Sequence, residues 1–265
     1  MSSDAVRVQE STALNRPRIA GIIPARYAST RLPGKPLQLI LGKPMIQRVY
    51  ERCSASKILD HLVVATDDIR IRDAVIGFGG DVIMTGTDHA TGTDRLAEAA
   101  DSIDCDIIAN IQGDQPFVDP GMIEEGVRPL LDDPAIELST LMFRIAKEED
   151  LMDSGVVKVV VNLAGDAMYF SRALIPWPHK DVPHPVYEHM GFYVYRKKML
   201  KKIASLPMTQ LERIEALEQL RWLENGIRIR VVETCCTDQA FCGFSVDTLN
   251  DVRRGEEMLR ERGLD

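Results

Sequence analysis

The chain has 265 residues, of which 45% are hydrophobic, and a formal net charge of -8. This length and apolar content support a full core in one domain, or in one domain with a lobe. A general nucleic-acid binder would be basic, so the acidic balance disfavours that class. No apolar run reaches the roughly 20 residues that span a bilayer, so we expect no membrane segment. An acidic protein that binds an anionic ligand must gather its cations locally.

The N-terminal segment lacks the apolar stretch of a signal peptide. We predict that residues 1–17 form a loose tail and that residues 18–265 form one domain. The five cysteines are odd in number and contain no CxxC pair, which is typical of free thiols in a reducing compartment. We therefore expect a cytoplasmic protein.

Local cations are concentrated in the loop 24–36, which follows a short apolar run, 19–23, that reads as a buried strand. The loop contains three cations, two aliphatic hydroxyls, one glycine and three prolines. Two interpretations fit this composition. It is either a phosphate-binding loop, in which backbone N–H groups and basic side chains converge on the anion, or an ordinary basic surface turn.

The rest of the first half alternates strands with helices. Buried strands are expected at 61–67, 81–85 and 106–111, with helices beginning near residues 45, 68 and 92 and after Pro120. This alternation predicts an α/β fold with a mostly parallel sheet and helices on both faces. Because ligands bind at the carboxyl ends of such strands, the polar clusters 24–35, 65–68 and 112–115 should lie at one edge. That coincidence favours the phosphate-binding interpretation.

The second half is richer in β structure and indicates a mixed insertion within the α/β domain. The pattern predicts a hairpin within 156–170, another β run over 187–195, and a strand over 227–233. Helices are expected over 197–206 and 211–225, and a charged closing helix follows residues 245–248.

Two carboxylates are candidate metal ligands. Asp114 follows a buried strand and should face the cationic loop, which is a common place for a magnesium ligand; the alternative is an aspartate that caps the next turn. Asp247 could supply a second carboxylate; the alternative is that it caps the closing helix. The residues alone leave both alternatives open.

A second group of side chains could hold a polar ligand. The guanidinium of Arg172 suits a planar carboxylate, because it can donate two parallel hydrogen bonds. His189 and Tyr193 should share one face of a strand, although a lone histidine of this kind is more often structural. Glu218 and Gln219 lie beside apolar positions of the expected helix 211–225, where polar side chains often only cap or face solvent.

These residues recur in motifs that resemble the 3-deoxy-manno-octulosonate cytidylyltransferases, or CMP-KDO synthetases. The resemblance spans roughly residues 19–260, with the motifs in family order. The motifs are Ile23-Pro24-Ala25-Arg26-Tyr27-Ala28-Ser29-Thr30-Arg31-Leu32-Pro33-Gly34-Lys35-Pro36-Leu37, Val64-Ala65-Thr66-Asp67-Asp68, Gly92-Thr93-Asp94-Arg95, Gln112-Gly113-Asp114-Gln115-Pro116, Ala167-Met168-Tyr169-Phe170-Ser171-Arg172, His189-Met190-Gly191-Phe192-Tyr193, Leu217-Glu218-Gln219-Leu220-Arg221 and Val246-Asp247-Thr248.

The resemblance implies a Rossmann-like, GT-A-like nucleotidyltransferase fold and a homodimer formed through a small β-rich lobe at about 156–195. It implies that CTP activates 3-deoxy-D-manno-octulosonate (KDO) to CMP-KDO and pyrophosphate, for lipopolysaccharide or capsule synthesis, with Mg²⁺ as cofactor. The positions that match the CTP site are Arg26, Ser29, Arg31, Lys35, Thr66, Thr93, Arg95 and Gln112. The positions that match the sugar-acid site are Gln112, Arg172, His189, Tyr193, Glu218 and Gln219. The expected catalytic residues are Arg26, Lys35, Asp114 and Asp247, the two aspartates as metal ligands.

The chain departs from the family pattern beside the second aspartate. Ser245 stands where many relatives have glycine, and Leu249 where proline often follows. Neither change removes a proposed ligand. Two alternatives to KDO activation remain at this point: another 2-keto sugar acid as substrate, such as 8-amino-8-deoxy-KDO, or a catalytically silent relative that binds CTP. The silent relative predicts loss of a charged site residue, and all four expected catalytic residues are present.

Overall fold

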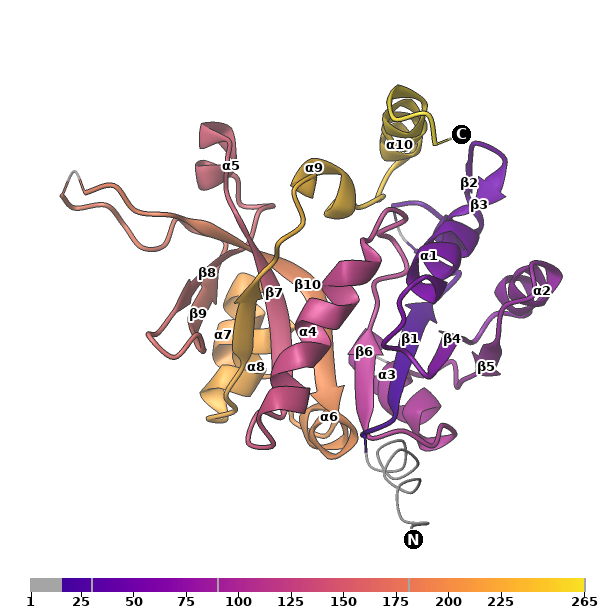
Figure 1. The fold of residues 1–265 in the computed structure, drawn as a ribbon, viewed down its shortest axis with the longest axis horizontal. Coiled ribbons are helices and arrows are strands. Elements are labelled where there is room, and N and C mark those ends of the chain that lie inside the picture. Colours follow the sequence, from indigo (N-terminus) through magenta and orange to yellow (C-terminus); the bar gives the residue numbers. More distant parts are fainter. Residues whose placement is uncertain (1–15, 30, 90, 181, 265) are drawn as a thin grey trace, which may run out of the picture.

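The computed structural model describes residues 16–29, 31–89, 91–180 and 182–264. Residues 1–15 of the predicted tail therefore lie outside the described residues. A nine-stranded sheet forms the centre of the protein, in the order β11-β7-β10-β6-β1-β4-β5, with β8 and β9 attached beside β10 (Figure 1). Its strands are β1 (Ile19–Ala25), β4 (His61–Thr66), β5 (Val82–Met84), β6 (Ile107–Asn110), β7 (Leu138–Arg144), β8 (Lys158–Val161), β9 (Ala167–Ser171), β10 (Tyr187–Arg196) and β11 (Arg230–Glu233).

The strands of the first half pair in parallel, as the alternating pattern predicted. β1 lies between β4 and β6, and β4 pairs with β5, all in parallel register. β11 is parallel to β7. β10 runs antiparallel between β6 and β7, so the β-rich second half joins the main sheet through this strand. The prediction of a largely parallel α/β sheet is confirmed.

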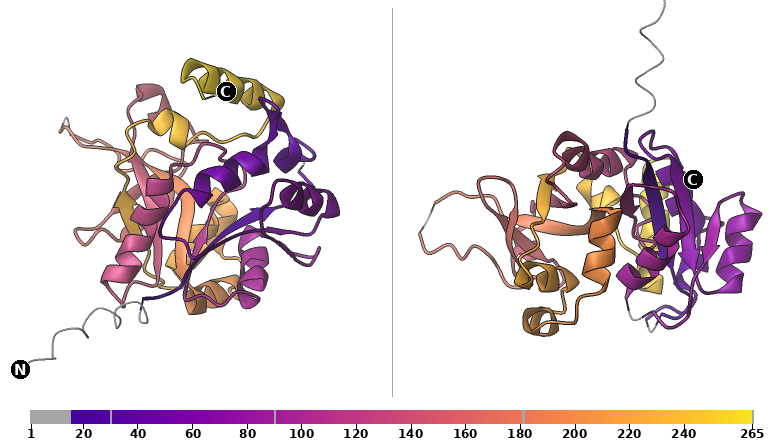
Figure 2. Two further views of the ribbon diagram at one scale, coloured as in Figure 1. Left: turned by 45° about the vertical axis from the view of Figure 1, so that its right-hand side comes forward. Right: turned by 90° about the horizontal axis from the view of Figure 1, so that it is seen from below.

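Helices cover both faces of the sheet, as expected (Figure 2). On one face, α1, α2 and α4 bury apolar side chains against β1 and β6. On the other, α3, α6 and α8 pack against β1, β6 and β10. The helices are η1 (Lys35–Leu37), α1 (Met45–Ser54), α2 (Ile69–Gly77), α3 (Gly92–Asp101), α4 (Pro120–Asp132), α5 (Glu148–Met152), α6 (Lys197–Ala204), α7 (Gln210–Glu215), α8 (Glu218–Glu224), α9 (Gln239–Cys242) and α10 (Leu249–Glu261).

The C-terminal helix α10 packs on the small hairpin formed by β2 (Leu39–Ile40) and β3 (Lys43–Pro44) (Figure 1). A separate apolar cluster holds it there. Phe117, after β6, stacks on Phe241 with ring centroids 4.4 Å apart, and Phe244 extends the stack. This packing brings the segment before α10 next to the loop after β6, although the two are far apart in sequence.

The helix expected over 211–225 is broken in two, so that prediction is wrong. α7 ends at Glu215, Ala216 adopts the left-handed conformation with φ 52°, and the extended Leu217 begins α8. The break turns the carbonyl oxygens of Glu215 and Ala216 toward Arg172, whose guanidinium donates to both at 2.7 and 3.4 Å. These bonds and the burial of Leu217 offset the cost of the left-handed alanine.

β8 and β9 form the predicted hairpin, which turns at Gly165 with φ 81°. β8 also pairs with the start of β10. Between β9 and β10 the chain extends away from the sheet, at the left of Figure 1. Trp177 on this extension is 69% exposed. Among the described residues, the structure contains no helix that is both long and apolar enough to cross a bilayer.

Candidate active site

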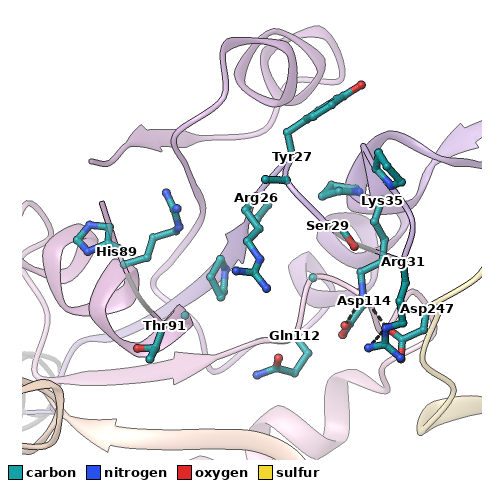
Figure 3. A pocket seen from close by; sticks show the side chains of 18 residues that line it. Arg26, Tyr27, Ser29, Arg31, Lys35, His89, Thr91, Gln112, Asp114 and Asp247 are labelled. Atoms are coloured by element: carbon teal, nitrogen blue, oxygen red, sulfur yellow. Dashed lines mark hydrogen bonds and ion pairs between the residues drawn. The ribbon is translucent and has the colours of Figure 1, made fainter. Parts of the chain in front are cut away.

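A cleft of about 760 Å³ lies at the carboxyl ends of β1 and β6. It brings together the cationic loop after β1, the segment before α3, the loop after β6 and the residue before α10 (Figure 3). Of the predicted site residues, those that line it are Arg26, Ser29, Arg31, Lys35, Arg95, Gln112, Asp114 and Asp247. The expected meeting of polar clusters at one sheet edge is confirmed for 24–35 and 112–115, whereas no residue of the third cluster, 65–68, lines this cleft.

The cationic loop closes on itself through a left-handed glycine. Gly34 has a φ of 67°, and its N–H donates to the Tyr27 carbonyl at 3.0 Å. A side chain at this position would meet the Tyr27 ring at 3.0 Å. The guanidinium of Arg70 lies over the same Tyr27 ring, 3.3 Å from its centroid. These contacts fix the turn that carries Lys35 back into the cleft.

Lys35 lies between the two predicted metal ligands. Its Nζ donates to Asp114 Oδ2 at 2.7 Å and to Asp247 Oδ1 at 3.1 Å. Arg31 reaches the same oxygen of Asp247 at 3.0 Å. Arg26 points into the open part of the cleft (Figure 3). The arrangement is a pair of carboxylates that share one ammonium ion beside a field of further cations.

Main-chain contacts position both carboxylates. Gly113 packs so close to β1 that a Cβ there would lie 2.9 Å from the Pro24 carbonyl oxygen. The Val246 N–H donates to the Asp114 carbonyl at 2.9 Å, which ties the two aspartate-bearing segments together. Thr248, not Asp247, caps α10, with Asp251 completing a capping box. The alternative role of Asp247 as the helix cap is therefore wrong, and its carboxylate faces the cleft.

Arg95 belongs to the opposite side of the cleft and is held from behind. The residue is only 5% exposed. Its guanidinium donates to Asp67 Oδ2 at 2.9 Å, at the end of β4, and to the hydroxyl of Thr85 at 2.5 Å. The ion pair compensates the burial of both charges and fixes the direction of Arg95.

Two predicted nucleotide-site residues do not line the cleft. Thr66 is fully buried, and its hydroxyl accepts from the Asp68 N–H at 3.2 Å. Thr93 is 3% exposed and donates to Glu218 Oε2 at 2.9 Å. The latter bond joins α3, beside the cleft, to α8. Burial raises the pKa of Glu218, an effect that the Thr93 bond and the Arg221 charge oppose.

Most of the predicted sugar-site residues gather in a second group, on β10 and α8, which the bond between Thr93 and Glu218 joins to α3. His189 and Tyr193 share one face of β10, with ring centroids 5.3 Å apart, as expected. Gln219 Nε2 lies 3.5 Å from His189 Nδ1. The Tyr193 hydroxyl and Glu218 Oε1 are buried and have no hydrogen-bond partner among the described residues. Such orphaned polar atoms indicate a place for a polar ligand or water.

Arg172 lies apart from the cleft lining and has its guanidinium engaged. Besides Glu215 and Ala216, it donates to the Ser154 carbonyl at 2.9 Å. Its own N–H donates to the Glu215 carboxylate at 2.9 Å. In this structure the residue thus clamps the end of β9 to the break between α7 and α8.

Sequence reasoning missed two cleft residues, His89 and Thr91 (Figure 3). His89 Nε2 contacts the Glu98 carboxylate, which also accepts from the Gly86 N–H. A single histidine in a loop has no spacing pattern that could have predicted its place in the cleft. Thr91 caps α3 through a capping box with Asp94, and that four-residue spacing could have marked the start of the helix.

The chemistry of the two aspartates fits a magnesium ion. No group of three or more histidine, cysteine or acidic side chains forms a metal cluster in the part of the chain that the structure describes. Mg²⁺ does not need one, because it binds through one or two carboxylates and completes its shell with phosphate and water oxygens. Asp114 and Asp247 provide hard oxygen donors that already share one cation, the Lys35 ammonium.

Comparison with known proteins agrees with this geometry. The family model for cytidylyltransferases matches residues 20–229. The chain is 53% identical over 251 residues to a 3-deoxy-manno-octulosonate cytidylyltransferase of Syntrophotalea carbinolica, covering 91% of this chain and 98% of the relative. The corresponding protein of Geobacter sulfurreducens is 50% identical over 253 residues, with 91% and 99% covered.

A solved structure is similarly close. It is a CMP:2-keto-3-deoxy-manno-octonic acid synthetase in complex with CTP, with a TM-score of 0.87 and 42% sequence identity. The match covers 92% of this chain and 99% of that structure. Sequence, fold and the carboxylate–cation cleft agree: the chain belongs to the family of 3-deoxy-manno-octulosonate cytidylyltransferases.

Proposed function

We propose that this protein transfers CMP from CTP to 3-deoxy-D-manno-octulosonate, releasing pyrophosphate, as part of lipopolysaccharide or capsule synthesis. The observation that carries the proposal is the cleft in which Lys35 bridges Asp114 and Asp247 beside Arg26 and Arg31. The protein as a whole is acidic. Concentrating cations at one cleft gives a triphosphate a specific place to bind.

In the proposed reaction the anomeric hydroxyl of the sugar acid attacks the α-phosphate in line while pyrophosphate leaves. Such transfers depend on positioning and charge neutralisation. Arg26, Ser29, Arg31 and Lys35 hold the phosphates, and Arg26 and Lys35 stabilise the charge on the departing pyrophosphate.

The nucleoside end of CTP is assigned to the opposite side of the cleft. Arg95 and Gln112 line that part, and Asp67 holds Arg95 in place. Thr93 supports the pocket through its bond to Glu218 on α8, and buried Thr66 supports the end of β4.

Asp114 and Asp247 are the residues that would hold Mg²⁺, and Lys35, whose ammonium contacts both carboxylates in this structure, would also interact with the phosphates. When bound, the ion supplies Lewis-acid charge to the phosphate and to the attacking hydroxyl. The two carboxylates hold a fixed position because the Val246 N–H joins their segments.

The sugar acid is assigned to the group of polar side chains on β10 and α8. Tyr193 and Glu218 offer the orphaned hydroxyl and carboxylate, and His189 and Gln219 lie beside them. Gln112, in the cleft, faces both substrates. Arg172 is the proposed partner of the sugar carboxylate. In this structure its guanidinium donates to three carbonyl oxygens, and the sugar carboxylate would compete with them for these hydrogen bonds.

We also propose a homodimer formed through the β-rich segment at about 156–195. The hairpin β8–β9 exposes large apolar side chains, among them Leu163 and Met168, and Trp177 is exposed on the adjoining extension. These side chains are available to be buried by a second copy of the chain.

Pyrophosphate release tests the function. The purified protein is assayed with CTP, Mg²⁺ and KDO, and in parallel with UTP and with 8-amino-8-deoxy-KDO. We expect release with CTP and KDO and far less with UTP. If pyrophosphate were released faster with the 8-amino sugar than with KDO, the 8-amino sugar would be the substrate in place of KDO. Binding of CTP without release with either sugar would identify a catalytically silent relative.

A further inference from the structure

The buried hydroxyl of Thr140 on β7 lies at the β-bulge of β10, where three polar atoms meet it. Thr140 is fully buried. Its Oγ1 lies 2.7 Å from the Phe192 carbonyl oxygen, 3.1 Å from the Met190 carbonyl oxygen and 3.0 Å from His189 Nε2. The register shift between Met190 and Tyr193 is what turns both carbonyls toward this one hydroxyl.

A hydroxyl has one proton, and this count fixes the direction of the bonds. The two carbonyl oxygens can only accept, so the Thr140 proton goes to one of them. The lone pairs of Thr140 Oγ1 then accept from His189, whose Nε2 must carry a hydrogen. If His189 Nε2 were the acceptor, the Thr140 oxygen would face two carbonyl oxygens with no proton between them.

The direction passes on to Gln219. A neutral imidazole with its hydrogen on Nε2 has a lone pair on Nδ1. Burial lowers the pKa of His189 to about 3, so the ring is neutral near pH 7. Gln219 must therefore turn its NH₂ group toward Nδ1, 3.5 Å away, and its carbonyl oxygen in the other direction.

We propose that Thr140 is a positioning residue for the sugar-acid site: through His189 it orients the Gln219 amide so that Oε1 accepts from a hydroxyl of the sugar acid. This rests on the proposed function, in which His189 and Gln219 lie at that site. The chain of bonds runs from a main-chain carbonyl to Thr140, His189 and Gln219. Because this chain of bonds begins at main-chain carbonyl groups of β10, which can only accept, the donor and acceptor of every later bond are fixed.

Thr140→Val tests the relay, because valine keeps the shape and removes the hydroxyl. We expect the KM for the sugar acid to rise about tenfold, the scale of one misdirected buried hydrogen bond, with the KM for CTP changed less than about twofold. Thr140→Ser retains the hydroxyl and should restore the KM. An unchanged KM for the sugar acid in a folded Thr140→Val variant would overturn the proposal.

Ser139→Ala is the matched control. Ser139 is equally buried on the same strand, but its hydroxyl donates to the Gly126 carbonyl on the opposite face of the sheet. It should lower stability without raising the KM for the sugar acid. A similar rise in this control would show that loss of any buried hydroxyl of β7 is sufficient, and would also overturn the proposal.

The tautomer is measured separately, by nitrogen-15 NMR of the histidine rings in the substrate-free protein, with His189→Gln used to assign the signal. We expect the Nε2–H form in the wild type and in Thr140→Ser, and loss of this single form in Thr140→Val. The Nδ1–H form in the wild type would overturn the relay. Since no substrate is present, this result stands even if the pyrophosphate assay refutes the proposed function.

Discussion

The Lys35 ammonium lies 2.7 Å from a carboxylate oxygen of Asp114 and 3.1 Å from one of Asp247, so a single cation contacts two acidic residues that are far apart in the sequence. Its side chain is 16% exposed, against 30% and 35% for the two aspartates. At this degree of burial two adjacent carboxylates repel each other unless a cation lies between them. The position of Lys35 is therefore evidence for where a divalent cation would bind.

Lys35→Met should separate the two roles of this residue. Without the ammonium the aspartates lose a competing cation, so the substrate-free protein should bind Mn²⁺ several-fold more tightly, as measured by titration calorimetry. Turnover should fall by about 10²–10³-fold, the scale of losing one preorganised charge contact to the transition state.

The control for that experiment is Lys43→Met, which removes an exposed lysine paired with Glu51 and should change neither quantity. Weaker Mn²⁺ binding by Lys35→Met would contradict the first expectation, because it would mean that Lys35 organises the aspartates and does not stand in for the metal.

The fold and half of the site could be predicted because both depend on simple patterns. Apolar runs ending in polar clusters gave the parallel strands, and the ends of β1 and β6 meet because parallel neighbours share an edge. For Asp247 the residues alone leave two roles open, metal ligand or helix cap, because its place depends on the distant contact between Val246 and Asp114; only the family resemblance favours the metal ligand.

Other features have no local signal. Ala216 breaks the expected helix although its neighbours, Glu215 and Leu217, favour helix, because the carbonyls it frees bind Arg172. The position of β10 between β6 and β7 is set by tertiary pairing and not by its own composition. The relay through Thr140 depends on a bulge, which the alternation of residues does not reveal.

Gly113→Ala should impair the metal site without removing a ligand. The added Cβ would lie 2.9 Å from the Pro24 carbonyl oxygen, and a main-chain atom of a central strand cannot move aside cheaply. We expect a loss of about 1–3 kcal/mol in the free energy of unfolding, measured by urea denaturation, together with lower turnover as Asp114 shifts.

Gly77→Ala is the control, because a Cβ there, at the end of α2, meets nothing within 4 Å. It should leave turnover unchanged and stability equal or slightly higher. If Gly113→Ala matched this control in both measurements, the close approach to Pro24 would have no consequence for Asp114.

The buried ion pair between Arg221 and Glu212 should hold α7 and α8 together at the break. The side chains are 6% and 7% exposed and make two hydrogen bonds, of 2.7 and 2.5 Å. Arg221→Met leaves a buried carboxylate without its partner, and we expect it to cost about 3–5 kcal/mol of unfolding free energy.

The double variant Glu212→Leu with Arg221→Met removes both charges and should recover part of that loss, which a double-mutant cycle measures. Recovery will be incomplete, because Glu212 also accepts from the Thr209 N–H in the capping box of α7, which contributes about 1 kcal/mol. If the loss in the double variant equalled the sum of the losses in the two single variants, there would be no pairwise interaction.

The pH dependence of stability should reveal the neutral state of His189. Burial lowers its pKa from 6.5 to about 3 in the folded protein. Below pH 6.5 the unfolded chain binds a proton at this residue that the folded chain does not bind, so stability falls as the pH falls, down to about pH 3. The slope is about 1.4 kcal/mol per pH unit for one proton.

The free energy of unfolding of the wild type and of His189→Gln should be compared by urea denaturation at pH 7.5, 6.0 and 5.0. As the pH is lowered, the free energy of unfolding of the wild type should fall more steeply than that of His189→Gln. His61→Gln, at an exposed histidine, controls for the loss of an imidazole in general. Parallel curves for the wild type and His189→Gln would mean that the folded protein accepts the proton, and a protonated ring could not accept a hydrogen bond from Gln219.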